Sequence, residues 1–519
     1  MGQFLLKLRG NIGCNSTLSQ WGVSRNFTWL SMKQNLVLIQ PRIGEWDIFT
    51  KSPTPPLSLL CAASLVCRDM EVRLVDLRTG RDWKRRLAAA IDEKTVAVGV
   101  TSLTGRMLLS ALEAVREARR LTAAPIIWGG VHASLMPEQT VSHELADYVV
   151  EGEGETALAE LARRLAAGAD TGGIPGVWRK VNGHAQGTPR APLLDVNTLP
   201  PAAYHIVDTE KYIQLYNGRR TLFYQTSRGC PCTCAHCYNK TYNSGRWRAL
   251  SAEKTLKEAA EFKERYRLGA IYFWDDNFFI DPVRARRIIS GMKELGLRCL
   301  LHGADVDTLA AMSDKDLDFL EEAGVDTLAI GVESAVDRVR SEVLKKRGDI
   351  ALVRAQLLRF KGRKMEIGCF FMLGLPGETA GEIKQTVAFA MEILRWGPNF
   401  RVPQFFNFTP YPGTQLFRQL EGGGTDFPQS IEGWGNYDWN HSMMYNASPE
   451  IQDLLSRIVL ISKYLDKNKA SFLDCYWFGK LVMNQYRPVA WFRLRTGFLR
   501  PMPEFWMSAV MNKLGRILE

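Results

Sequence analysis

The stretch SRGCPCTCAHCYNK, residues 227–240, gathers cysteines on what looks like a single loop. Cys230, Cys234 and Cys237 have the spacing C-x3-C-x2-C, and the apolar run 221–226 (TLFYQT) just before them predicts a buried strand. Thiolates on one irregular loop can occupy three corners of a cubane, because iron–sulfur clusters are held by cysteine thiolates. The fourth iron then keeps the open position that metal catalysis requires. The loop therefore indicates a [4Fe–4S] cluster.

A structural zinc ion is the alternative for this loop. Either Cys232 or His236 would supply the fourth ligand. Zinc sites usually draw paired ligands from two separated segments, and no second pair is present here. We therefore favour the cluster and treat Cys232 as a non-ligand. The other cysteines are scattered and typical of buried thiols: Cys14, Cys61, Cys67, Cys299, Cys369 and Cys475.

Strands and helices alternate from this loop onward. About six strand–helix units are predicted, fewer than the eight of a closed TIM barrel, so we expect a partial barrel that is open on one side. Catalytic groups should lie at the carboxyl ends of its strands. The predicted strands are 221–226, 270–274, 298–302, 325–330, 366–372 and 403–408, and the helices are 252–266, 282–295, 315–323, 350–363 and 381–394.

A second alternating series precedes the loop. Its strands are nearly continuous in Val and Ile, which favours a doubly wound parallel sheet. Ligands of such sheets bind beyond the carboxyl ends of the strands, where Ser102, Thr104, Gly129, Gly130 and His132 are expected. The predicted strands are 35–40, 71–76, 95–101, 124–128 and 148–151, and the helices include 57–66 and 106–120.

These patterns divide the chain into five parts. The first is expected to be a disordered extension, with Met32 as the natural start of the protein. A doubly wound domain, a linker rich in Gly and Pro, the partial barrel and a C-terminal region follow. Their predicted ranges are 1–31, 32–171, 172–215, 216–420 and 421–519.

Composition limits the class of protein. Of the 519 residues, 46% are hydrophobic and 23% charged, which is typical of a globular protein and excludes a mainly disordered one. Ten cysteines are too few for a disulfide scaffold, so we expect a reducing, cytoplasmic location. The sequence has no run of about 18 apolar residues, the length that a single membrane-spanning helix needs. The net charge of +11 is compatible with nucleic acid, an anionic membrane or an anionic substrate.

The cysteine spacing, placed after the first strand of a partial (βα)6 barrel, resembles the radical S-adenosylmethionine (SAM) superfamily. The resemblance implies that the unique iron chelates the amino and carboxyl groups of SAM. Reductive cleavage of SAM then yields methionine and a 5′-deoxyadenosyl radical. It also implies that His236, which precedes the last cysteine, lies near the adenine. Cys232 departs from the family pattern, which more often has an apolar or aromatic residue there.

Three further motifs of the barrel resemble this family. They are WDDNFF (274–279), GVES (331–334) and GLPGET (374–379), each at the end of a predicted strand. Acceptor carboxylates suit the protonated amine of SAM, and glycines permit close approach of the backbone. A helix N-cap is the alternative role of Asp276. The SAM contacts that the resemblance implies are Asp275, Asp276, Glu333 and Gly374.

The first domain resembles the cobalamin-binding domain that precedes the barrel in one large radical SAM class. That class includes class B methyltransferases and anaerobic magnesium-protoporphyrin ester cyclases. The motifs are VTSLTG (100–105), WGGVHASLMPE (128–138) and VVEGEGE (149–155). Gly129 and Gly130 would let a corrin or its nucleotide tail approach the sheet edge, and Ser102 and Thr104 would hydrogen-bond the tail.

The D-x-H-x-x-G motif, which supplies the lower cobalt ligand in other cobalamin enzymes, is absent from the first domain. Gly130 stands two residues before His132, where that motif has an aspartate. We therefore assign no cobalt ligand. The alternative to cobalamin is a degenerate Rossmann-like domain that only shapes the substrate cleft.

The C-terminal tail mixes aromatic and basic residues. This pattern suits an interfacial helix on an anionic membrane, stacking on nucleic acid, or a last helix whose aromatics cover the open side of the barrel. The tail and the resemblance favour a hydrophobic substrate, such as a lipid or a tetrapyrrole, over nucleic acid. The residues are Arg487, Arg493, Arg495, Arg500, Lys513 and Arg516, with Trp491, Phe492, Phe498, Phe505 and Trp506.

The resemblance implies cobalamin-dependent radical SAM methylation of an unactivated carbon. One SAM would methylate cobalamin, a second would yield the radical, and a flavodoxin or ferredoxin would donate electrons. The alternatives are a radical SAM oxidative cyclase or rearrangement enzyme without methyl transfer and, more remotely, a zinc-stabilised binding protein. A methylthiotransferase would need three more cluster cysteines in the first domain, which Cys61 and Cys67 do not supply. We expect a cytoplasmic enzyme that associates with a membrane surface.

Overall fold

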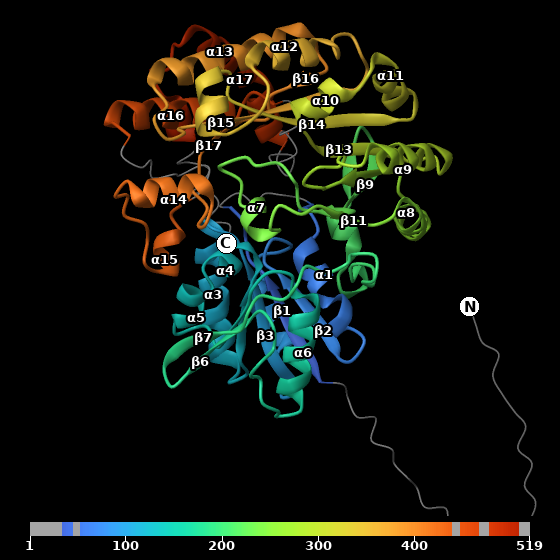
Figure 1. Cartoon of the computed structure of the whole chain (residues 1–519), viewed down its shortest axis with the longest axis vertical. Coiled ribbons are helices and arrows are strands. Elements are labelled where there is room, and N and C mark those ends of the chain that lie inside the picture. The colour runs from blue at the N-terminus through green and yellow to red at the C-terminus, as the bar shows by residue number, and fades with distance from the viewer. Residues whose placement is uncertain (1–33, 45–51, 438–446, 467–476, 508–519) are drawn as a thin grey trace, which may run out of the picture. The chain divides into compact units, whose positions relative to one another are not determined.

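The computed structural model describes residues 34–44, 52–437, 447–466 and 477–507. The extension 1–31, together with Met32, Cys14, Cys475, Lys513 and Arg516, lies outside these ranges. The described residues belong to one compact unit that starts at Gln34. Within it, a first α/β domain is drawn in blue to teal and a second in green to orange (Figure 1).

The first domain contains the predicted parallel sheet. Five parallel strands follow the order β2-β1-β3-β4-β5, and the antiparallel hairpin β6–β7 extends the sheet beyond β5. The hairpin comes from the segment that the sequence describes as a linker. The strands are β1 (Asn35–Gln40), β2 (Glu71–Asp76), β3 (Thr95–Ser102), β4 (Ile126–Gly129), β5 (Tyr148–Val150), β6 (Val177–Val181) and β7 (His184–Gly187).

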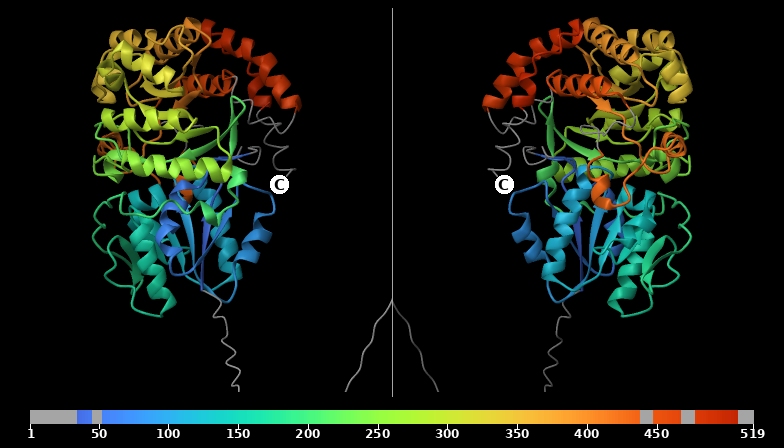
Figure 2. Two further views of the ribbon diagram at one scale, coloured as in Figure 1. Left: turned by 90° about the vertical axis from the view of Figure 1, so that its right-hand side faces the viewer. Right: turned by 90° about the vertical axis from the view of Figure 1, so that its left-hand side faces the viewer.

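Helices cover both faces of this sheet, as the side views of Figure 2 show. Because successive side chains of a strand point to opposite faces, Leu36 and Leu38 join one core with α1 and α6, and Val37 and Ile39 join another with α2 and α3. The helices are α1 (Leu57–Val66), α2 (Trp83–Ala90), α3 (Arg106–Leu121), α4 (Gly130–Leu135), α5 (Pro137–Ser142) and α6 (Gly154–Ala166).

The second domain is the predicted open barrel. Its strands follow the order β16-β15-β14-β13-β12-β9-β8, with β17 also pairing with β15. All neighbours are parallel except the hairpin β8–β9. The strands are β8 (Gln214–Tyr216), β9 (Arg219–Tyr224), β12 (Ala270–Phe273), β13 (Arg298–Ala304), β14 (Val325–Glu333), β15 (Glu366–Leu373), β16 (Phe400–Arg401) and β17 (Phe405–Asn407). The predicted fold class is confirmed.

The helices of this domain cover the outer face of the sheet. Side-chain caps fix where several of them begin: Ser251 accepts from Lys254 N at α8, and Thr379 forms a capping box with Glu382 at α13. The helices are α7 (Asn239–Tyr242), α8 (Ala252–Tyr266), α9 (Pro282–Glu294), α10 (Val306–Ala311), α11 (Asp314–Glu322), the π-helix Val339–Val343, α12 (Ile350–Leu358) and α13 (Ala380–Trp396).

After the barrel, the chain returns to the first domain. Helices α14 (Gln415–Gly422) and α15 (Ile431–Trp434) lie beside α3 and α4 (Figure 1). Phe417, Phe427 and Trp434 enter the same hydrophobic core as α3. The sequence shows no periodicity here and did not predict this contact. Through it, the two domains share a core in addition to the cavity described below.

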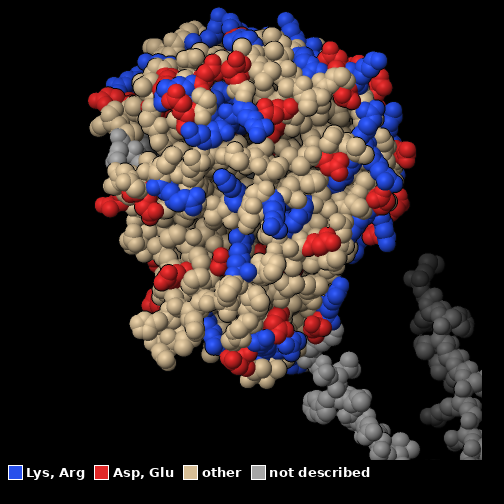
Figure 3. Space-filling view, viewed as in Figure 1, with Lys and Arg blue, Asp and Glu red and all other residues tan. Residues whose placement is uncertain are grey.

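The C-terminal helices α16 (Pro449–Ser462) and α17 (Trp477–Thr496) pack against each other, and α17 also contacts α13. None of the helices in the described ranges is both long and apolar enough to cross a membrane. On the face shown in Figure 3, Lys and Arg gather in several patches that Asp and Glu border. This face therefore shows mixed charge rather than one continuous basic stripe.

Candidate functional site

The cysteine loop leaves β9 and is framed by the short ribbon of β10 (Ser227–Arg228) and β11 (Arg248–Ala249). Cys230, Cys234 and Cys237 are half-buried free thiols. Gly229 makes the sharp bend before them, with φ +89°, and a Cβ there would lie 1.9 Å from the carbonyl oxygen of Arg246. Only glycine fits this position, because the backbone is both left-handed and crowded.

Burial changes the acidity of these thiols. It raises the pKa of Cys237 to about 12 and also raises the pKa of Cys234, which the charge of Lys346 opposes. Because iron binds thiolates, loading this loop with a cluster must release protons. Among the described residues, no group of three or more His, Cys, Asp or Glu side chains is arranged to hold a single metal ion.

Cys232 lies beside both the thiol of Cys230 and the carboxylate of Asp305. Its thiol donates a hydrogen bond to Asp305 Oδ2 at 3.4 Å, and Asp305 also caps α10 by accepting from Thr308 N at 2.7 Å. Asn277 Nδ2 donates to the same carboxylate at 3.3 Å. Cys232 is thus tied to the end of β13.

Asp275 and Asp276 hold the cysteine loop from the end of β12. Asp275 is 1% exposed and accepts from Thr226 N and Thr226 Oγ1, both at 2.7 Å, and from Ser227 N at 2.6 Å. Asp276 Oδ2 accepts from Gly229 N at 2.8 Å. Of the two carboxylates, Asp276 borders the cavity between the domains. Asp275 anchors the backbone that precedes the cysteines.

Glu333 ends β14 in a left-handed conformation, with φ +67°. Residues other than glycine rarely adopt this backbone conformation, and such strain is typical of functional sites. Lys346 Nζ lies 3.4 Å from Glu333 Oε1 and donates to the carbonyl of Gly331 at 2.7 Å. Buried Arg340 fixes this region by donating to Val332 O at 2.7 Å. Lys346 and Arg340 were not predicted, because their sequence context resembles an ordinary solvated helix end.

His236 is half-buried near Glu333 and Lys346. Burial lowers the pKa of its imidazole, which the charge of Glu333 opposes, so the ring is neutral near pH 7. Its Nδ1 has no hydrogen-bond partner among the described residues. The ring therefore has an unused polar atom beside the cysteine loop.

The GLPGET loop after β15 is organised by a buried carboxylate. Glu378 Oε2 accepts from Gly374 N at 2.7 Å and from Leu375 N at 3.1 Å, and Gly374 has φ +76°. Burial raises the pKa of Glu378 to about 7, against the opposing effect of these backbone hydrogen bonds. Glu378 thus shapes the loop on which Gly374 lies.

At the edge of the first sheet, the predicted residues contact one another. Ser102 Oγ donates to Gly129 O at 2.7 Å, and a Cβ on Gly130 (φ +87°) would lie 2.6 Å from the Ser102 backbone. Thr104 Oγ1 is 3.0 Å from Nδ1 of buried His132, whose ring lies edge-on to Trp434 at 5.9 Å. Thr104 and His132 therefore face the protein interior.

A cavity of about 340 Å³ lies between the two domains. Its wall combines the first sheet edge with the start of the barrel and includes Ser102, Gly130, Arg228, Trp274 and Asp276. A smaller cavity of about 80 Å³ runs between the sheet and α1 and α6, past Gly99 and Gly129. The two cavities share Ser58, Thr101, Gly130, Gly154 and Tyr242 in their walls.

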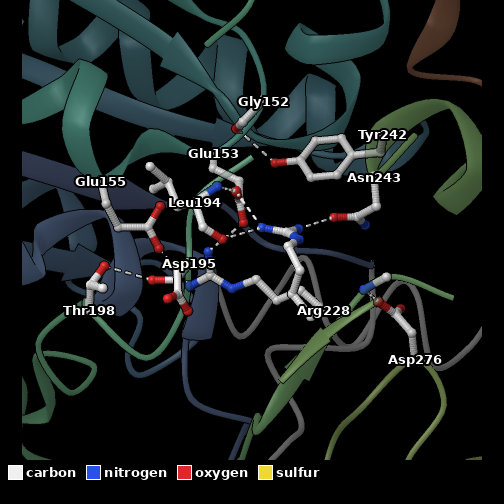
Figure 4. Close-up of polar contacts among 12 residues, drawn as sticks. Gly152, Glu153, Glu155, Leu194, Asp195, Thr198, Arg228, Tyr242, Asn243 and Asp276 are labelled. Carbon is white, nitrogen blue, oxygen red and sulfur yellow. Dashed lines mark hydrogen bonds and ion pairs between the residues drawn. The ribbon is translucent and has the colours of Figure 1, made fainter. Parts of the chain in front are cut away.

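Buried ion pairs join the domains beside the larger cavity (Figure 4). Arg228 bridges Glu153 at 2.7 Å and Glu155 at 2.6 Å, and Arg248 pairs with Glu153 at 2.7 Å. Tyr242 OH donates to Gly152 O at 2.8 Å. The VVEGEGE motif of the first domain is thus bound by ion pairs and a hydrogen bond to the segment that carries the cysteines.

The C-terminal tail has both a packed side and an exposed side. Ala490 and Leu494 enter the barrel core, and Arg493 forms a buried ion pair with Glu504 at 2.5 Å. Arg493 departs from the alternative in which arginines form the rim, whereas exposed Arg495 and the packing of Trp491 against the barrel core agree with it. The exposed large side chains here are Val489, Phe492, Phe498, Phe505 and Trp506.

Comparison with known proteins agrees with this architecture. Residues 224–390 match the radical SAM superfamily model, and residues 50–162 match the B12 binding domain model. An uncharacterized methyltransferase of Pyrococcus horikoshii is 28% identical over 421 residues, covering 79% of this chain and 88% of the relative.

Two further similarities extend this picture. An anaerobic magnesium-protoporphyrin IX monomethyl ester cyclase of Rubrivivax gelatinosus is 26% identical over 57% of this chain and 53% of its own length, so this chain spans about half of that relative. The fold is similar to that of the radical SAM methyltransferase TsrM from Kitasatospora setae, solved with cobalamin and a [4Fe–4S] cluster. The TM-score is 0.60, with 20% identity over 76% of this chain and 75% of TsrM. The chain belongs to the radical SAM superfamily and joins the radical SAM barrel to a B12-binding domain.

Proposed function

We propose that this radical SAM enzyme is a cobalamin-dependent methyltransferase that acts on an unactivated carbon of a hydrophobic small molecule. The observation that carries the proposal is the cavity between the domains, whose wall contains both the sheet edge with Ser102 and Gly130 and the barrel edge with Asp276. Reacting atoms must come within about 3–3.5 Å of one another. A single cavity bordered by both edges supports the proposal, because a substrate in it would have both edges within reach.

Cys230, Cys234 and Cys237 are the proposed ligands of a [4Fe–4S] cluster. The donor set fits, since three half-buried thiols lie on one loop that Gly229 bends. When bound, the cluster and SAM supply a 5′-deoxyadenosyl radical, and cobalamin supplies a methyl donor. The chain itself holds the loop in place from below through Asp275.

The proposed SAM contacts are His236, Asp276, Glu333 and Gly374, to which we add Lys346. Asp276 offers an acceptor to a protonated amine, while Lys346 offers a cation to a carboxylate. The unpaired Nδ1 of neutral His236 suits a heterocycle. Gly374 permits close approach of the backbone. Asp275 leaves the proposed set, because three donors of the loop already occupy its carboxylate.

Cobalamin is proposed to occupy the edge of the first sheet. Gly129 leaves room there, because a Cβ on it would meet nothing closer than the carbonyl oxygen of Val150 at 3.9 Å. Gly130 instead lets the chain pass close to the Ser102 backbone, since a Cβ on it would lie 2.6 Å from that backbone. The adjoining smaller cavity suits the nucleotide tail, and Ser102 lines the larger cavity next to it. Thr104 supports the edge from behind through His132. Because the ring of His132 packs on Trp434, we propose no cobalt ligand from it.

Cysteine substitutions test the cluster assignment in anaerobically reconstituted protein. Cys230→Ala, Cys234→Ala and Cys237→Ala should each lose SAM cleavage, because losing one thiolate opens a cluster corner to water. Cys232→Ala is the matched control and should keep its iron and sulfide content and its activity. If Cys232→Ala loses iron as completely as the other three variants, the ligand assignment is wrong.

Oxidative cyclisation or rearrangement without methyl transfer is the second candidate function. The similarity to the Rubrivivax gelatinosus cyclase favours it. A zinc-stabilised binding protein is a remote third candidate, which iron and sulfide analysis separates from the first two. We propose a flavodoxin or ferredoxin as electron donor and a cytoplasmic location.

Peripheral membrane association is proposed on the basis of the tail. Phe498 is 58% exposed and Trp506 71%, and Arg500, which lies between them in the sequence, is exposed as well. Amphipathic segments of this composition bind anionic bilayers by burying aromatic rings between lipid headgroups.

The proposed domain ranges stay 32–171, 172–215, 216–420 and 421–519, although hairpin β6–β7 continues the first sheet into the linker.

A further inference from the structure

The inner face of the half-barrel carries a row of aromatic rings. Phe223 of β9 and Tyr272 of β12 are partners in register and stack with ring centroids 4.7 Å apart. Trp274 lies 5.3 Å from both of them. It stacks on His302 of β13 at 4.6 Å. These rings cover the first three parallel strands of the barrel.

The row continues across the remaining strands. His302 contacts Phe370 of β15 at 6.0 Å, and Phe370 stacks on Phe406 of β17 at 6.0 Å. Between them, β14 presents the small residues Ala329 and Gly331. Because these side chains are small, His302 of β13 and Phe370 of β15 contact each other across β14. We call this row the aromatic wall: Phe223, Tyr272, Trp274, His302, Phe370 and Phe406.

The wall faces away from the helical core. The alternate residues Ile271, Phe273, Cys369 and Phe371 belong to the core beneath the outer helices. Because side chains alternate across a strand, the wall residues point to the inner side. Trp274 is 40% exposed, and several other wall rings are only half-buried. These half-buried rings are therefore partly accessible from the inner side.

The wall is uncharged along its length. Burial lowers the pKa of His302, so its imidazole is neutral near pH 7. Charged groups stand at the two ends of the barrel strands, as the Glu333–Lys346 pair at the carboxyl end and the Glu366–Arg401 pair at the amino end. A ligand on the wall would meet rings rather than charges.

The wall begins at the proposed reaction site. Phe223 and Trp274 line the cavity between the domains, together with Asp276. Glu333 is the last residue of β14, two residues beyond Gly331. A molecule lying on the wall would thus present one edge to the cysteine loop and the first domain.

We propose that the aromatic wall binds the substrate of this enzyme, and that the part of the substrate on the wall is an uncharged, planar, conjugated ring system. This inference rests on the proposed function and narrows its substrate class. Aromatic rings pair with other planar π-systems in offset-stacked or edge-to-face arrangements, which add to the burial of apolar area. A saturated lipid would gain only the area.

A matched pair of probes tests the planar preference. 2-Naphthol and decahydro-2-naphthol share one carbon skeleton and one hydroxyl, but only the first is flat and conjugated. Binding to the full-length, anaerobically reconstituted protein is measured by equilibrium dialysis. We expect 2-naphthol to bind about tenfold more tightly, as a few ring contacts would give. Equal affinities, or no binding of 2-naphthol up to its solubility limit, would overturn the proposal.

Variants locate the bound probe. Phe370→Leu and Phe406→Leu keep apolar volume and remove the ring, so each should weaken 2-naphthol about three- to tenfold and leave decahydro-2-naphthol unchanged. Phe492→Leu, on the exposed side of α17, is the control and should bind both probes like the wild type. Unchanged 2-naphthol binding in both wall variants would show that the site lies elsewhere and refute the wall.

The same samples separate this inference from the proposed function. Corrin content and SAM cleavage are measured beside probe binding. Protein that retains corrin and cleaves SAM but shows no planar preference contradicts the wall alone. Protein that prefers 2-naphthol through Phe370 and Phe406 yet binds no corrin supports the wall and contradicts methyl transfer.

Discussion

Arg228 links the two domains, and its replacement has a calculable cost. Its guanidinium is the sole ion-pair partner of Glu155 among the described residues, and the Glu155 side chain is only 3% exposed. Glu153 keeps Arg248 when Arg228 is lost. Arg228→Met therefore leaves the buried carboxylate of Glu155 without an ion-pair partner. Removing one partner of a buried ion pair costs about 3–5 kcal/mol, because the remaining charge is uncompensated. We expect the free energy of unfolding to fall by that amount.

A double-mutant cycle isolates the pair. Glu155→Gln alone should cost about 1–2 kcal/mol, because Arg228 still has Glu153. The double variant Arg228→Met/Glu155→Gln should cost less than the sum of the two single variants by at least about 1 kcal/mol, since no charge at position 155 is then stranded.

Urea unfolding of the apoprotein at pH 7, followed by circular dichroism, measures each free energy without a contribution from bound cofactors. Arg85→Met is the control, since Arg85 forms an exposed pair with Asp82, and its cost should stay below about 1 kcal/mol. A cost below about 1 kcal/mol for Arg228→Met, or strictly additive costs in the cycle, would refute the reasoning.

Three further predictions concern the sheet edge, the glycine loop and the tail. Gly130→Ala should lose corrin binding and at least about 2 kcal/mol of stability, because its Cβ would lie 2.6 Å from the Ser102 backbone. Gly173→Ala is the control, with similar φ and open surroundings, and should cost only about 1 kcal/mol. Equal costs of the two variants in urea unfolding would contradict this prediction. The raised pKa of Glu378 means that wild-type stability falls as pH rises from about 4.5 to about 7, while Glu378→Gln should lack this loss, so parallel pH profiles of the two proteins would argue against it. Phe498→Ser/Trp506→Ser should weaken sedimentation with anionic liposomes and leave SAM cleavage intact; undiminished sedimentation would remove the support for membrane association.

The sequence predicts the regular parts of the fold well, because local signals coincide with burial there. Strand Asn35–Gln40 and helix Ala252–Tyr266 have the bounds that their apolar patterns give, and Ser251 marks the start of the helix. Asp276 and Glu333 also lie where strand ends were expected. Each of these features depends on residues close together in the chain.

Long-range contacts could not be predicted in this way. Trp434 lies in a segment without periodicity, yet it is buried against the first domain. The ion pairs of Arg228 join residues more than 70 positions apart in sequence. Lys346 lies within an ordinary basic run, and only the fold brings it beside Glu333. The hydrogen bonds of Asp275 to Thr226 and Ser227 were not predicted for the same reason, since they depend on the path of the loop.

The central claim is methyl transfer across the cavity between the domains. The most direct measurement supplies SAM with a deuterated methyl group to anaerobically reconstituted enzyme and follows the label by mass spectrometry. The account predicts label in the corrin fraction of wild-type protein, and loss of that label in Gly130→Ala. Corrin that stays unlabelled, with 5′-deoxyadenosine forming and all label in methionine, would contradict methyl transfer and favour the cyclase.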